Sequence, residues 1–197
     1  MSALAVSNVV LWIVVLALLA LVLALTRQIG VLHERISPVG ALMINKGLTV
    51  GEKVPVVAVS DLDGKALQVG APRSDGLSTL LLFVSPTCPV CESLLPVVQA
   101  SRRQEKSWLH IVLASDGDLA TQREFVRGHG LTEFQYVVSA PLGMTYQVSR
   151  LPFAALVDGA GILRARGLVN SREHLESLFE AQRLGVASLQ DYFTAHS

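Results

Sequence analysis

The sequence predicts an α/β domain, a sandwich with a mixed central sheet, preceded by a single transmembrane helix. Strand-like and helix-like segments alternate through most of the chain, as expected for layered α/β folds. An apolar run without charged residues fills the first 26 residues. The remaining length, roughly 150–170 residues, suits one domain with a single sizeable core. We therefore divide the chain into an anchor at 1–26, a juxtamembrane helix and linker at 27–47, and a folded domain at 48–197.

The amino-terminal run is long enough to cross a membrane. About 25 helical residues extend about 37 Å, whereas the hydrocarbon core of a bilayer is ~30 Å thick. A cleaved signal peptide normally has a basic start and a shorter apolar run, and no Lys or Arg precedes this one. We therefore expect an uncleaved single-pass anchor whose residues 3–25 contact the lipid bilayer. Pro38 and Gly40 mark the linker that follows it.

The folded domain is predicted to alternate strands and helices. The continuous apolar run at 79–84 is typical of a central strand that is buried on both faces. A helix with apolar residues at i, i+3, i+4 and i+7 follows Pro89. The last helix has Asn170 as its expected capping residue. Further strands are expected at 54–59, 66–69, 109–114, 135–138, 153–157 and 162–165, and a further helix at 119–129.

The chain has two cysteines, Cys88 and Cys91, which directly follow the predicted central strand. A disulfide scaffold would need more pairs and a structural zinc site about four ligands. Cys88 is expected where the next helix begins. The free N–H groups and the dipole of a helix N-terminus stabilise a thiolate, which lowers the pKa of such a thiol. The position therefore indicates a redox pair rather than two unrelated thiols.

Within this pair we expect Cys88 to be the exposed attacking sulfur and Cys91, one helical turn later, the resolving sulfur. The first helical position suits a proline, which lacks the N–H that would be unpaired there. The reversible Cys88–Cys91 disulfide is then the redox group, and we expect neither a metal nor a separate cofactor. The rest of the expected active-site loop comprises Pro86, Thr87, Pro89 and Val90.

Leu151 and Pro152 precede the strand predicted at 153–157. A cis peptide bond at this proline would place the backbone beside Cys88, where a partner chain could pair by strand addition. An ordinary trans proline that ends a loop is the alternative. We therefore select Leu151 and Pro152 as candidate substrate-binding residues.

Two arguments about the side of the membrane on which the domain lies disagree: one rests on the charges beside the apolar run, the other on the redox chemistry of the cysteine pair. Arg27 and Arg35 follow the apolar run, so the positive-inside rule alone places the domain in the cytoplasm. Glu34 partly offsets this bias. Anchored Cys-X-X-Cys domains more often act on exported proteins. We therefore expect a protein of the cytoplasmic (inner) membrane whose domain faces the periplasm.

Together these features resemble the thioredoxin superfamily. The resemblance covers roughly 48–184 and rests on the strand, Cys-X-X-Cys and helix unit, on Pro96, and on Leu151-Pro152 before a hairpin. A narrower resemblance is to the accessory proteins of methylamine utilisation. It rests on residues 27–35 after the anchor, on 38–42, and on the stretch Ser85-Pro86-Thr87-Cys88-Pro89-Val90-Cys91.

The resemblance implies a thioredoxin-like three-layer sandwich and a periplasmic protein needed to mature methylamine dehydrogenase. Its client would be the disulfide-rich small subunit of that enzyme, and a membrane redox partner would reset the pair. The resemblance also assigns Cys88 and Cys91 as the redox pair and Pro152 as the cis-proline. Thr87 stands where thioredoxins usually have Trp, and the strand at 79–84 lacks their buried acid. Both departures argue against thioredoxin-like reduction.

Other functions compete with disulfide formation or isomerisation. The same chemistry run backwards would keep the cysteines of an apo-protein reduced. Alternatively, the two thiolates could hold copper in a non-enzymatic assembly module, with His129 and His174 as the candidate further ligands. A peroxidase would need a wider spacing between its two cysteines. Nucleic acid is not an expected partner, because 16 basic residues balance 16 acidic ones.

Overall fold

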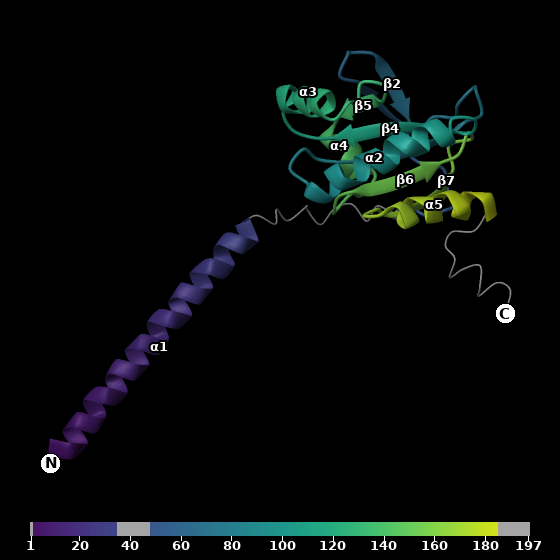
Figure 1. The fold of residues 1–197 in the computed structure, drawn as a ribbon. Helices are drawn as coiled ribbons and strands as arrows, with labels where there is room; N and C mark the ends of the chain where they lie inside the picture. The colour runs from purple at the N-terminus through teal and green to yellow at the C-terminus, as the bar shows by residue number, and fades with distance from the viewer. Residues whose placement is uncertain (1, 35–47, 185–197) are drawn as a thin grey trace, which may run out of the picture. The chain divides into compact units, whose positions relative to one another are not determined.

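A computed structural model describes residues 2–34 and 48–184 of the chain (Figure 1). The chain divides into two compact units, residues 1–45 and 46–197, and each is described by itself.

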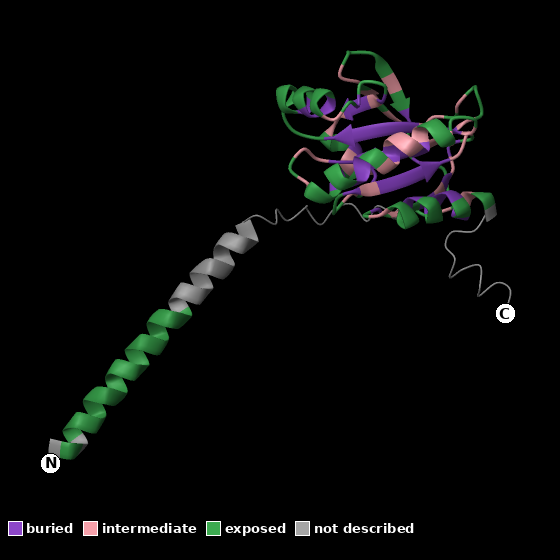
Figure 2. Ribbon diagram, viewed as in Figure 1, coloured by how far each residue is buried: buried purple, intermediate pink, exposed green. Residues whose placement is uncertain are grey.

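The first unit contains one continuous helix, α1 (Ser2–Glu34). Its segment Ala5–Val22 has a mean hydropathy of 2.7 and no buried residue, so its described side chains are exposed on every side (Figure 2). A helix that is apolar all round suits a lipid environment. It is long and apolar enough to cross a membrane, as predicted. The helix continues through residues 27–34, whereas the linker predicted at Pro38 and Gly40 lies outside the described residues.

The second unit is built on a five-stranded mixed sheet in the order β5-β4-β3-β6-β7. β3, β4 and β5 are parallel, whereas β6 and β7 run antiparallel to their neighbours. β3 is therefore the central strand, as predicted. The strands are β3 (Ser78–Phe83), β4 (Leu109–Ser115), β5 (Gln135–Val138), β6 (Phe153–Val157) and β7 (Leu163–Leu168).

The sheet lies between two outer layers, which gives the predicted three-layer sandwich (Figure 1). Leu80 and Leu82 of β3 pack in the core that contains α2, α3 and α5. Leu81 and Phe83 point to the opposite face and pack with α4 and the β1–β2 hairpin. Both cores are buried, as the purple strands in Figure 2 show. The outer elements are β1 (Val57–Ser60), β2 (Ala66–Val69), α2 (Pro89–Gln104), α3 (Leu119–Gly128), α4 (Ala140–Thr145) and α5 (Arg172–Leu184).

Three local predictions need correction. The first strand begins at Val57 rather than at residue 54, because Pro55 has no N–H to donate to a ladder. The last strand continues to Leu168 rather than ending at residue 165, because β6 offers partners as far as Phe153. The capping residue of α5 is Ser171 and not Asn170: the Ser171 hydroxyl accepts a hydrogen bond from the His174 N–H at 3.4 Å.

Candidate redox site

Cys88 lies at the carboxyl end of the central strand and at the start of α2. Val84 extends the ladder past β3, with its N–H donating to the Ala114 carbonyl at 2.9 Å. The chain then turns through Ser85, and Cys88 is the N-cap of α2 with extended backbone angles (φ −107°, ψ 103°). Pro89 occupies the first helical position, as predicted.

The two cysteines form a disulfide, with their Cα atoms 5.2 Å apart. Cys88 Sγ also accepts a hydrogen bond from the Cys91 N–H at 3.2 Å, the bond that an N-cap side chain normally makes. A sulfur held by this N–H is placed to carry negative charge once the disulfide is reduced.

The two sulfurs differ in access to solvent. Cys88 is half-buried, whereas Cys91 is 0% exposed and belongs to the core that includes Leu94 and Leu95. An external thiol or disulfide can therefore reach Cys88 but not Cys91. This arrangement has the asymmetry that an attacking and a resolving cysteine require.

Hydrogen bonds within the loop before Cys88 fix its shape. The Ser85 hydroxyl accepts from the Thr87 N–H at 3.3 Å and lies 3.1 Å from the Thr87 hydroxyl. The Ser85 carbonyl accepts from the Cys88 N–H at 3.1 Å. The other predicted loop residues are at the surface: Pro86 is half-buried, and Pro89 and Val90 are exposed.

Leu151 and Pro152 lie next to this loop because β6 pairs with β3. Phe83, the last residue of β3, is opposite Phe153, the first residue of β6. The Leu151–Pro152 peptide bond is cis. Pro152 is buried and its carbonyl accepts from the Val169 N–H at 3.0 Å, whereas the Leu151 side chain is 37% exposed. The structure thus brings both candidate residues to the same end of the sheet as Cys88.

A groove of about 560 Å³ at this end of the sheet was not predicted. It lies between the carboxyl ends of β3 and β4, the short helix α4, and the segment that leads to Pro152. α4 itself was missed, although Ser139 caps it and Pro141 lies in its first turn. A serine followed closely by proline is a usual helix-start signal, and it could have revealed this helix.

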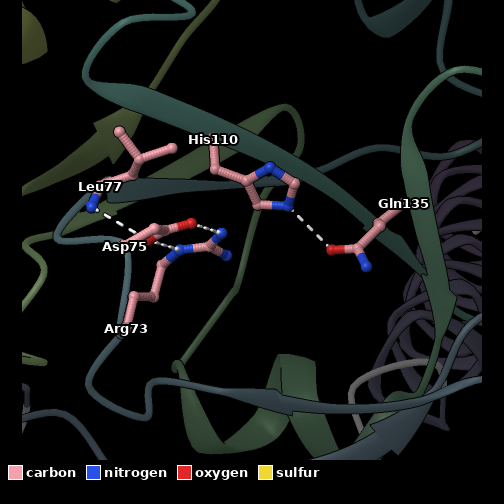
Figure 3. Close-up of polar contacts among 5 residues, drawn as sticks. All are labelled: Arg73, Asp75, Leu77, His110 and Gln135. Atoms are coloured by element: carbon pink, nitrogen blue, oxygen red, sulfur yellow. Dashed lines mark hydrogen bonds and ion pairs between the residues drawn. The ribbon is translucent and has the colours of Figure 1, made fainter.

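Figure 3 shows a polar cluster of Arg73, Asp75, Leu77, His110 and Gln135, which lies at the end of the sheet where β3 and β4 begin. The His110 ring is hydrogen-bonded to the Gln135 side chain at 2.8 Å, and burial lowers the pKa of His110 below its usual value. Arg73 pairs with Asp75, which also accepts from the Leu77 N–H, and the Arg73 hydrogen bond lowers the pKa of Asp75 to about 2. Because His110 pairs with Thr79 near the start of β3, this cluster is not part of the cysteine site.

Within residues 2–34 and 48–184, no group of three His, Cys, Asp or Glu side chains is arranged to hold a metal ion. The His129 ring lies 3.0 Å from the Phe125 carbonyl and packs on the Phe125 ring, and His174 is exposed.

A three-layer α/β domain with a Cys-X-X-Cys pair at the start of the helix after the central strand, and a cis-proline before the antiparallel neighbour, is a thioredoxin fold. Solved structures with this fold resemble the chain. The thioredoxin domain of a Bacteroides vulgatus thiol-disulfide oxidoreductase aligns with a TM-score of 0.55, at 17% identity, over 66% of this chain and 97% of that one. A secreted Mycobacterium tuberculosis disulfide oxidoreductase aligns with a TM-score of 0.52, at 19% identity, over 64% and 95%. At these identities, the likeness shows the fold alone.

Relatives by sequence define the family. No family model matches the chain. A protein of Methylobacillus flagellatus named methylamine utilization protein MauD is 47% identical over 94% of this chain and 90% of the relative. A protein of Paracoccus denitrificans with the same name is 44% identical over 96% and 94%. The chain therefore belongs to the MauD family.

Proposed function

We propose that this chain is a membrane-anchored thiol–disulfide oxidoreductase that forms or isomerises disulfides in an exported client. The observation that carries the proposal is the half-exposed Cys88 at a helix N-terminus beside a fully buried Cys91. In an oxidising cycle, a client thiolate attacks Cys88 Sγ, the Cys88–Cys91 bond breaks, and the electron pair leaves on Cys91 Sγ. A second client thiolate then attacks the client sulfur of the mixed disulfide and releases Cys88. Two electrons and two protons have passed from the client to the cysteine pair.

In isomerisation the reduced pair starts the reaction. The Cys88 thiolate attacks a client disulfide and forms a mixed disulfide, and the released client thiolate attacks another client disulfide. If rearrangement stalls, Cys91 attacks Cys88 Sγ and releases the client thiolate, because Cys91 Sγ lies within bonding reach of Cys88 Sγ. Cys91 thus limits the lifetime of the mixed disulfide.

The reduction potential of the Cys88–Cys91 couple tests the direction of electron flow. The full-length chain in detergent micelles is equilibrated in graded glutathione buffers, and its free thiols are then trapped and counted. A potential of about −120 to −180 mV supports donation or isomerisation of disulfides. A reduction potential of about −270 mV would support the reductant alternative and would rule out disulfide donation as the main activity.

We propose the small subunit of methylamine dehydrogenase as the client, because the MauD relatives are named for methylamine utilization. A full-length Cys91→Ser chain should accumulate a mixed disulfide with this subunit, since the resolving thiol is missing. A Cys88→Ser chain is the matched control and should accumulate none. Absence of the adduct from cells that make an otherwise matured subunit would contradict this choice of client.

We further propose that α1 anchors the chain in the inner membrane with the domain in the periplasm. The apolar segment Ala5–Val22 supports an anchor, and the redox chemistry supports the periplasmic side. Protease added to spheroplasts should digest the domain without breaking the cells. Protection in spheroplasts, with digestion in inverted vesicles, would place the domain in the cytoplasm, as the positions of Arg27 and Arg35 alone predict.

A further inference from the structure

Leucine recurs at every seventh position of the amino-terminal helix. The positions are Leu4, Leu11, Leu18, Leu25 and Leu32. α1 is helical from Ser2 to Glu34, so positions seven residues apart, close to two helical turns, fall on one face. In the heptad notation abcdefg these leucines occupy every d position of the helix. Crossing a bilayer does not by itself require such a repeat, because apolar residues in any order suit lipid.

The a positions of the same heptads complete a pattern that is typical of paired helices. They are occupied by Asn8, Val15, Val22 and Ile29. β-Branched residues at a with leucine at d favour a parallel pair of helices, and a single asparagine at a fixes the register and the number of helices. Asn8 is exposed in the single chain, and its amide can form hydrogen bonds with the same amide of a second helix. The face is therefore complementary to itself.

The repeat continues past the end of the lipid. The 33 residues of α1 extend about 50 Å, whereas the hydrocarbon core is ~30 Å thick, so roughly a dozen helical residues lie beyond it. In this part of the sequence the e, f and g positions are all polar: Thr26, Arg27, Gln28, His33 and Glu34. A helix in water gains most of its stability from the packing of an apolar face. The a and d positions supply such a face where lipid no longer surrounds the helix.

The charges of α1 are placed where a second copy is tolerated. Arg27 and Glu34 are its two charged residues, and both fall at f, the position farthest from a partner helix. The e and g positions flank the contact between paired helices and hold no Arg, Lys, Asp or Glu. Two identical helices can therefore pair without bringing like charges together.

From these observations we infer that α1 pairs in parallel with α1 of a second copy of this chain, through the face formed by its a and d positions. Parallel pairing follows because every copy crosses the membrane in the same direction. The inference rests on α1 as a membrane anchor and is independent of the redox chemistry. It adds an interaction surface to the anchor and holds two cysteine pairs at one place in the membrane.

The test uses full-length chains in the membranes of the cells that make them. All carry Cys88→Ser and Cys91→Ser, so that a cysteine introduced into α1 is the only thiol and thiol exchange at the redox site plays no part. Copper–phenanthroline with dissolved oxygen takes two electrons from two such thiols, which lose their protons and form an intermolecular disulfide. The readout is the fraction of chain with twice the monomer mass on a non-reducing gel.

The introduced cysteines compare two faces of the helix. Leu18→Cys and Leu25→Cys probe d positions, whereas Leu16→Cys and Leu23→Cys replace the same residue type at b and are the matched controls. The d variants should cross-link at least about fivefold more than the b variants, because a disulfide closes only when the two Cα atoms lie within ~7 Å. Both d variants should cross-link, since in a parallel pair every position faces its own copy.

A second pair of substitutions tests the contact beyond the lipid. In chains that carry Leu25→Cys, Ile29→Glu sets two carboxylates opposite each other at a and should lower the cross-linked fraction at least about fivefold. Val31→Glu adds the same charge at c, on the outer side of the helix, and should leave the fraction unchanged.

Other results would overturn the pairing. Equal yields at b and d, or no cross-linking at d, would exclude this face as the contact. A product of another mass would assign the face to a different membrane protein. Release of the chain from the membrane by alkaline carbonate would overturn the anchor and the pairing with it.

Discussion

The difference in access between the two cysteines gives a quantitative prediction for the reduced protein. Cys91 has no exposed surface, so an alkylating reagent can reach it only after the first two turns of α2 open. That opening also exposes Leu94 and Leu95, which are each 2% exposed in the folded domain. Burial of two such side chains is worth about 3–6 kcal/mol. Because about 1.4 kcal/mol corresponds to a factor of ten, Cys91 should react at least about 100-fold more slowly than Cys88.

The assay is alkylation of the full-length chain, reduced and held in detergent, by iodoacetamide at neutral pH. Mass spectrometry of proteolytic peptides measures the modification of each cysteine with time. The chain unfolded in guanidinium is the control, and there the two cysteines should react at similar rates. Modification of Cys91 within about fivefold of Cys88 in the folded chain would refute the assignment of an exposed attacking and a buried resolving sulfur.

Three further predictions concern the stability of the domain and are measured by urea unfolding of the full-length chain in detergent. Gly70→Ala should lower the free energy of unfolding by about 2–4 kcal/mol, because φ is +86° and the new Cβ would lie 2.6 Å from a backbone carbonyl oxygen. Gly64 has φ +80° but open space around it, so Gly64→Ala should lower the free energy of unfolding by only about 1–2 kcal/mol. Equal losses in the two variants would contradict the steric argument. Burial lowers the pKa of His110, so the unfolded chain binds a proton there more tightly than the folded chain does. The free energy of unfolding should therefore fall as the pH drops below about 6.5, and His110→Gln should reduce this fall. An unchanged pH dependence would exclude His110 as the cause of the fall. The buried Tyr136 hydroxyl donates a hydrogen bond to Gln122 Oε1 at 2.6 Å. Gln122→Leu removes this acceptor and should lower the free energy of unfolding by about 1–3 kcal/mol. An unchanged free energy of unfolding would show that another group accepts the hydrogen bond.

The central part of the fold was predictable because strong local signals agree with the tertiary structure. The apolar run at 79–84 is buried on both faces, and Leu80, Leu81 and Leu82 are each 0% exposed. The cysteines follow it directly, so the strand end and the helix start place them without information from elsewhere in the chain. The proline after Cys88 then occupies the first helical position, where its missing N–H leaves no hydrogen bond unmade.

Other features depend on partners that are distant in sequence. The end of β7 at Leu168 is set by pairing with β6, which offers a partner as far as Phe153. The hydrogen bond between the Gln182 side chain and the Ser78 hydroxyl joins residues 104 positions apart. The isomer of the Leu151–Pro152 bond could not be read from sequence, because the dipeptide itself allows both forms.

The groove at the carboxyl end of the sheet escaped prediction for a related reason. α4 has only six residues, with a glycine inside it, so it has no helical repeat of apolar residues. Its position is set by Leu142 and Tyr146, which are buried against the sheet face that carries Phe83. The lining of the groove comes from segments that are far apart in sequence and meet only in the folded domain, so no local pattern marks it.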